Sequence, residues 1–283
     1  MNHQVELRSR AARRIAEAYG SAPNLSMVAV AGSVGAGLAD RWSDLEIDCY
    51  WYESPTTEER LAPIKHLGAE LTTLWDYDED DQEWSEDYRF DGLPVTVSNF
   101  RVNTVDAFLD AVLIEGNLDT VKHFRLAALR SSYALRGSQM LAEWRQRAAV
   151  FPDRLVHSLV ERSLTPGQFP GWRHREVLVA RGDAIAVRSL LAAVGEGVFD
   201  AVLAINRIYR SHRLVKWQHS LFDQCRLLPP EFAPRLEGLW HHDLEVALTH
   251  AEALLLTTLD LAENEFGTSL ANVRNDLIRK RDT

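Results

Sequence analysis

The most constraining feature of this chain is residues 27–48, in which two apolar runs flank a turn of small residues. The first run, residues 27–31, is continuous and leads directly into Gly32-Ser33. A short continuous apolar run is typical of a buried strand. The sequence therefore predicts a glycine–serine turn at the end of a core strand. Such a turn can present backbone N–H groups and a hydroxyl to the oxygens of a phosphate.

The second run, residues 45–51, alternates apolar and polar side chains and places its acids on one face. Asp44 and Glu46 stand two positions apart, so on a strand both side chains lie on the same side of the sheet. Two carboxylates on one face can hold Mg²⁺ together with substrate phosphates. Asp48 lies one step further along that face, and we interpret it as a solvated acid at the strand end in preference to a metal ligand or a residue that supports one. A phosphate-binding turn next to such a pair predicts phosphoryl or nucleotidyl transfer.

A resemblance to a known family rests on five positions: Gly32, Ser33, Gly37, Asp44 and Glu46. Their order resembles the signature of nucleotidyltransferases of the DNA polymerase β superfamily. The surrounding stretch is most similar to the bacterial small-molecule branch, which includes aminoglycoside and lincosamide nucleotidyltransferases. The resemblance implies that Asp44 and Glu46 are catalytic residues that hold Mg²⁺. It also implies that Gly32 and Ser33 bind the phosphates of ATP or another NTP.

The chain departs from this family on a later strand, where the family carries a third acid that completes the metal site or takes the acceptor proton. Here residues 93–98 place valines on one face and Pro94, Thr96 and Ser98 on the other, so no acid stands at the expected face. Three interpretations stay open. The base comes from the helical part of the chain, a metal-bound hydroxyl needs no base, or the fold only binds nucleotide.

The chain as a whole predicts an α+β fold. A helix over residues 4–18, the two runs above and a hairpin over residues 88–100 indicate a small mixed sheet with flanking helices. We expect a nucleotidyltransferase catalytic domain over residues 1–125 and a C-terminal helical-bundle domain for the acceptor over residues 126–283. Helices of the later part are expected at residues 120–130, 137–148, 153–164, 174–193, 196–210 and 242–265.

Two further segments have more than one interpretation. Lys216 resembles a lysine that follows a helix in uncharacterised relatives, which implies that it reaches the triphosphate. A cation at the negative end of a helix dipole is an equally good interpretation. The acidic residues 76–87 are interpreted as a solvated, mobile loop in preference to a subsite for a polycationic acceptor.

Composition narrows the class of protein further. The chain has 283 residues and a formal net charge of −10. An acidic chain suits a cationic small molecule better than a nucleic acid, which is not favoured as a partner. No apolar run approaches the ~20 residues of a membrane span, and the N-terminus lacks the apolar core of a secretory signal. Cys49 and Cys225 are expected to be free thiols in the cytoplasm.

These observations predict a Mg²⁺-dependent nucleotidyltransferase. It would transfer a nucleoside monophosphate, with AMP as the expected one, from an NTP to a hydroxyl of a small acceptor and release pyrophosphate. The resemblance implies that the acceptor is an antibiotic. Two alternatives stay open: a protein AMP-transferring, antitoxin-like enzyme, and a nucleotide-binding protein without catalysis. The family often forms its site between two protomers, so the resemblance allows a homodimer.

Overall fold

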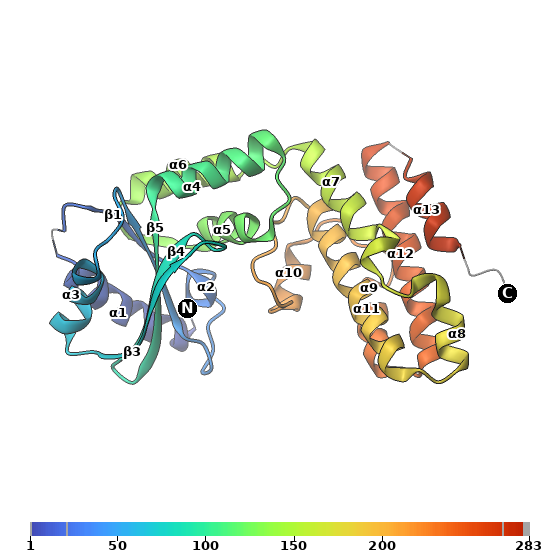
Figure 1. Cartoon of the computed structure of the whole chain (residues 1–283), viewed down its shortest axis with the longest axis horizontal. Coiled ribbons are helices and arrows are strands. Elements are labelled where there is room, and N and C mark those ends of the chain that lie inside the picture. Colours follow the sequence, from blue (N-terminus) through green and yellow to red (C-terminus); the bar gives the residue numbers. More distant parts are fainter. Residues whose placement is uncertain (1, 21, 268, 280–283) are drawn as a thin grey trace. The chain divides into compact units, whose positions relative to one another are not determined.

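The computed structural model describes residues 2–20, 22–267 and 269–279. The chain divides into two compact units, Met1–Val150 and Phe151–Thr283 (Figure 1). The domain boundary expected at residue 125 falls inside a helix of the first unit. The chain beyond it stays in that unit because the strand Tyr133–Arg136 pairs with the first strand of the sheet.

The first unit contains a six-stranded sheet with the order β3-β4-β5-β2-β1-β6. Only β2 and β5 pair in parallel among these described neighbours, so the sheet is mixed, as the α+β prediction expects. The strands are β1 (Leu25–Val30), β2 (Leu45–Trp51), β3 (Glu70–Asp78), β4 (Glu83–Phe90), β5 (Leu93–Arg101) and β6 (Tyr133–Arg136).

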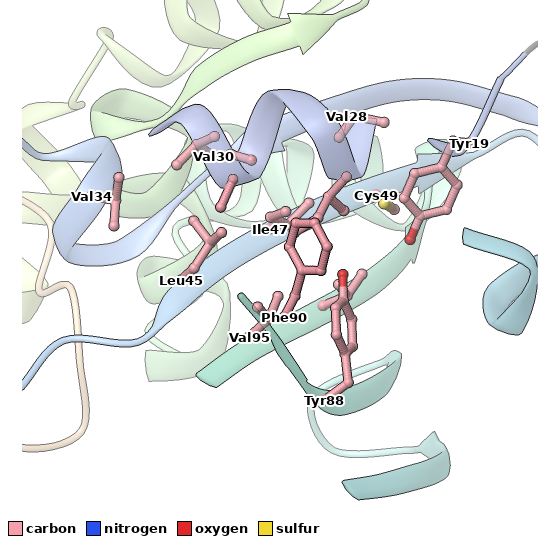
Figure 2. Packing of buried hydrophobic residues seen from close by; sticks show 14 of the residues in the cluster. Tyr19, Val28, Val30, Val34, Leu45, Ile47, Cys49, Tyr88, Phe90 and Val95 are labelled. Carbon is pink, nitrogen blue, oxygen red and sulfur yellow. The ribbon is translucent and has the colours of Figure 1, made fainter. Parts of the chain in front are cut away.

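Helices cover both faces of this sheet. They are α1 (His3–Ala18), α2 (Gly32–Gly35), α3 (Thr57–Leu67), α4 (Val102–Asp110), a π-helical turn (Ala111–Glu115), α5 (Thr120–Ser131) and α6 (Ser138–Ala148). On one face, side chains of β1, β2, β4 and β5 form an apolar core with α1 and α3 (Figure 2). On the other face, Tyr50 packs on Phe100 and on Trp144 of α6, with ring centroids 5.7 and 5.1 Å apart. The second face carries the polar residues of the candidate site.

The hairpin expected over residues 88–100 is present as β4 and β5. Asp91 and Gly92 form its turn with φ of +51° and +78°, the left-handed backbone that a tight hairpin turn requires. The loop expected over residues 76–87 is wrong, because β3 and β4 occupy most of it. The acids fit into strands because they alternate: Glu83 and Asp87 lie on the polar face, while Glu86 is buried on the other face beside Arg60.

The second unit is helical over its described residues. Its helices are α7 (Asp153–Leu164), α8 (Arg175–Ala180), α9 (Ala184–Ile205), α10 (Gln218–Gln224), α11 (Phe232–His241), α12 (Leu244–Phe266) and α13 (Ala271–Ile278), with 3₁₀ turns at Pro166–Gln168 and Trp172–His174. The helix break expected between residues 193 and 196 is absent, since α9 is continuous. Gly195 and Gly197 lie inside α9 because Trp240 and Phe169 each approach within 2.8 Å of where a Cβ would stand.

None of the helices in the described part of the chain combines the length and the apolar character that a membrane crossing requires.

Candidate functional site

The turn after β1 depends on two glycines. Gly32 opens α2 with φ of +56°, a conformation that side-chain-bearing residues adopt at a cost. A Cβ on Gly35 would stand 2.7 Å from the carbonyl oxygen of Val30, so α2 packs against the strand end only with glycine there. The carbonyl of Ser33 accepts a hydrogen bond of 2.8 Å from the amide of Leu38, which closes the turn. The half-buried Ser33 is thereby fixed at the end of the core strand.

Glu46 lies directly over this turn. A Cβ on Gly32 would stand 2.3 Å from Cδ and Oε2 of Glu46 and 2.5 Å from its Oε1. The backbones are joined as well, since the amide of Ala31 donates to the carbonyl of Glu46 at 3.0 Å. The structure therefore brings the Glu46 carboxylate into the space that the missing side chain of Gly32 leaves.

Asp44 precedes β2 by one residue and is half-buried. The backbone before it is held by Arg8 of α1, which is 2% exposed. Its guanidinium donates to the carbonyl of Ser43 from Nε at 2.9 Å and from Nη2 at 2.5 Å. The Ser43 hydroxyl in turn donates to Asp40 at 3.1 Å. Asp44 is thus carried by a fixed backbone, two residues from Glu46 along β2.

A threonine occupies the position on β5 beside Glu46, as Thr96 pairs with Glu46 in the parallel register. Asp87, which the sequence analysis did not single out, lies one strand further on β4. Its Oδ1 accepts from the Thr96 hydroxyl at 2.7 Å, and its Oδ2 accepts from Trp75 Nε1 at 2.9 Å. The signal was the alternation of Asp87 with the aromatic residues Tyr88 and Phe90. At the position on β5 where an acid was expected and is absent, the structure therefore has a hydroxyl that is hydrogen-bonded to a carboxylate of β4.

Asp48 is only 4% exposed, and its hydrogen bonds go to other residues than those of the turn. Its Oδ2 accepts from Arg125 Nη1 at 2.6 Å and from the hydroxyl of Tyr50 at 3.0 Å. Arg125 also lies 3.6 Å from Glu83, whose Oε1 accepts from Ser98 at 3.1 Å. Burial raises the pKa of Glu83 to about 7, against the opposing effect of Arg125. The expectation of a solvated acid at the strand end is therefore wrong, because Asp48 lies in the middle of β2 and is buried. Its hydrogen bonds to Arg125 and Tyr50 also count against its interpretation as a metal ligand.

The donor chemistry of the turn fits Mg²⁺. Within the described residues, no three side chains of the His, Cys, Asp and Glu types converge as a metal cage would require. Mg²⁺ is usually bound by one or two carboxylates, with waters and substrate phosphates as its other ligands. Glu46 supplies one such carboxylate next to the turn, and Asp44, two residues before it in the chain, offers a second.

Lys216 belongs to the second unit, where it is exposed and lies shortly before α10. Its part in binding the triphosphate stays a prediction.

Comparisons with known proteins identify no family for this chain. No family model matches the chain, and no curated protein matches it. One solved structure that matches this chain is a nucleotidyltransferase-like protein from Exiguobacterium sibiricum 255-15. It is 14% identical, the match covers 90% of this chain and 77% of that chain, and the TM-score is 0.42. A likeness of this extent assigns no activity, so the function must rest on the site itself.

Proposed function

We propose that this chain is a Mg²⁺-dependent nucleotidyltransferase. It transfers a nucleoside monophosphate, AMP from ATP in the first instance, to a hydroxyl of a small acceptor and releases pyrophosphate. The observation that carries the proposal is the contact between Glu46 and Gly32. A metal–triphosphate complex needs a carboxylate and a phosphate-binding turn at one point, and the contact of the Glu46 carboxylate with this turn supports that arrangement.

The roles of the residues follow from their chemistry. The space beside Gly32 holds the Glu46 carboxylate, so Gly32 is proposed to bind phosphate through its backbone N–H. The Ser33 hydroxyl can donate to a phosphate oxygen. Asp44 and Glu46 would hold the metal. When bound, Mg²⁺ neutralises charge on the reacting phosphate and on the leaving pyrophosphate. Lys216 is proposed to bind the triphosphate, so Lys216→Met should weaken Mg·ATP binding in calorimetry without lowering the thermal unfolding midpoint.

The structure adds a candidate for the base. Asp87 faces the same side of the sheet as Glu46, and the hydroxyl of Thr96 lies between them. A carboxylate so placed can take the proton of an acceptor hydroxyl through Thr96. The proposal therefore does not need a base from the second unit.

The test is transfer of label from ATP that carries radioactive α-phosphate, with Mg²⁺, a panel of hydroxyl-bearing small molecules including aminoglycosides and lincosamides, and a cell lysate. Label on a small molecule supports the proposal, and label on a protein supports the alternative of protein AMP transfer. Binding of ATP without any pyrophosphate release would indicate a nucleotide-binding protein and contradict the proposal.

Two variants sharpen this test. Asp44→Asn removes a carboxylate of the proposed metal pair and should abolish transfer while the chain stays folded. Asp91→Asn is the matched control, because Asp91 lies at the turn between β4 and β5 and pairs with Arg14. Equal activity in the two variants would contradict the metal assignment.

A further inference from the structure

Three acids alternate along this segment: Asp44 directly precedes β2, and Glu46 and Asp48 lie on the polar face of that strand. Alternate residues of a strand lie about 7 Å apart, so all three could serve one metal-binding surface. By chemistry alone the three carboxylates are equivalent ligands for a divalent cation. Their surroundings differ, because Asp44 and Glu46 are half-buried while Asp48 is 4% exposed.

Arg125 of α5 contacts Asp48. Its guanidinium bridges two carboxylates from different strands, Asp48 on β2 at 2.6 Å and Glu83 on β4 at 3.6 Å. Ser98 on the intervening strand β5 pairs with Asp48 in register and donates to Glu83 at 3.1 Å. Asp48, Arg125 and Glu83 therefore form one charged cluster directly beyond Glu46.

Packing holds Arg125 in this place. Its Cζ lies 3.6 Å from the centroid of the Phe100 ring, and its side chain is 15% exposed. Tyr50 stacks on Phe100 and donates to the same Asp48 oxygen that Arg125 contacts. An ion pair removed from water in this way is screened little by solvent, so the Asp48 oxygen is strongly committed to the guanidinium.

We infer that Arg125 is a positioning residue of the proposed metal site: it pairs with the Asp48 carboxylate, contacts Glu83 beside it, and so restricts the metal to Asp44 and Glu46. The inference rests on the proposed function. Without Arg125, the carboxylates of Asp48 on β2 and Glu83 on β4 would be left without a cation. Divalent cations bind such groups, so the site would extend along β2 to Asp48.

The test counts the Mn²⁺ ions that the full-length protein binds without nucleotide, by electron paramagnetic resonance of free Mn²⁺. The wild type is expected to bind Mn²⁺ in a manner that Asp44→Asn abolishes. Asp48→Asn should leave the number and affinity of these ions within about twofold of the wild type. Arg125→Met should bind at least one further Mn²⁺, and the double variant Arg125→Met/Asp48→Asn should return to the wild-type number.

Arg147→Met is the matched control. Arg147 also bridges two acids, Asp106 at 2.6 Å and Asp110 at 2.7 Å, but these lie on α4, outside the sheet. It should leave Mn²⁺ binding unchanged, which separates the effect of Arg125 from the loss of any bridging arginine. Thermal unfolding of each variant shows whether it is folded.

Two results would overturn the inference alone. One is loss of Mn²⁺ binding in Asp48→Asn, which would show that Asp48 is a metal ligand. This result can be obtained even if the Arg125 variant does not fold. The other is a folded Arg125→Met protein with the wild-type number of ions. A wild type that binds no Mn²⁺, or binds it independently of Asp44, would instead contradict the metal site of the proposed function and remove the inference with it.

Discussion

Gly32 offers the sharpest perturbation of the site, because alanine there does two things at once. The residue has φ of +56°, and a side-chain-bearing residue in this left-handed region costs about 1–2 kcal/mol. The new Cβ would also stand 2.3 Å from Cδ of Glu46, well inside any allowed contact, so the carboxylate must move. Gly32→Ala should therefore lose stability and displace a proposed metal ligand.

The control for the first effect is Gly68→Ala at the end of α3. Gly68 has φ of +63°, and nothing lies within 4 Å of its added Cβ. Each variant should unfold at a temperature lower by roughly 2–8 °C, the shift that 1–2 kcal/mol gives in a chain of this size. Only Gly32→Ala should also weaken Mg·ATP binding. The loss should be about tenfold or more, as expected when one metal ligand is displaced. Wild-type affinity in a folded Gly32→Ala protein would refute the argument that Glu46 and the turn act together.

Three further predictions concern the sheet. Arg60→Met should lower the free energy of urea unfolding by about 3–5 kcal/mol, because buried Glu86 loses its cationic partner at 2.8 Å and keeps only the neutral Asn99. A loss under about 1 kcal/mol would contradict this. Between pH 4.5 and about 7 the folded chain keeps a proton on Glu83 that the unfolded chain has released, so this group makes unfolding easier as pH rises. The urea midpoint should therefore fall less between pH 5 and 7.5 in Glu83→Gln than in the wild type. The same pH dependence in both proteins would contradict this role of Glu83. Asp87→Asn should slow pyrophosphate release by about 100-fold or more with unchanged Mg·ATP affinity in calorimetry, and a wild-type rate would exclude Asp87 as the base.

Local pattern was enough for part of the fold. The continuous run of β1, the glycine–serine turn and the alternation of β2 are set by neighbours in sequence, and the structure contains each of them. The turn at Asp91-Gly92 was equally predictable, since few residue pairs adopt two positive φ values in succession. Thr96 was correctly placed on the opposite face from Val95 and Val97, because the side-chain period of a strand leaves no other choice.

The remainder depended on contacts distant in sequence. Residues 76–87 have the composition of a loop, and only pairing with β3 and β5 makes β4 a strand. Asp87 could not be placed beside Thr96 until that pairing was known. Arg125 lies 77 positions from Asp48, and nothing in the local sequence of α5 indicates which acid it meets.

The most direct measurement of the central claim is a calorimetric titration of the wild-type protein with a non-hydrolysable ATP analogue, with Mg²⁺ and with EDTA in its place. If Asp44, Glu46 and the turn at Gly32-Ser33 bind one metal–triphosphate complex, the analogue binds with Mg²⁺, and its affinity falls at least tenfold in EDTA and in Asp44→Asn. Binding of equal strength under all three conditions, or no binding with Mg²⁺ present, would contradict the account.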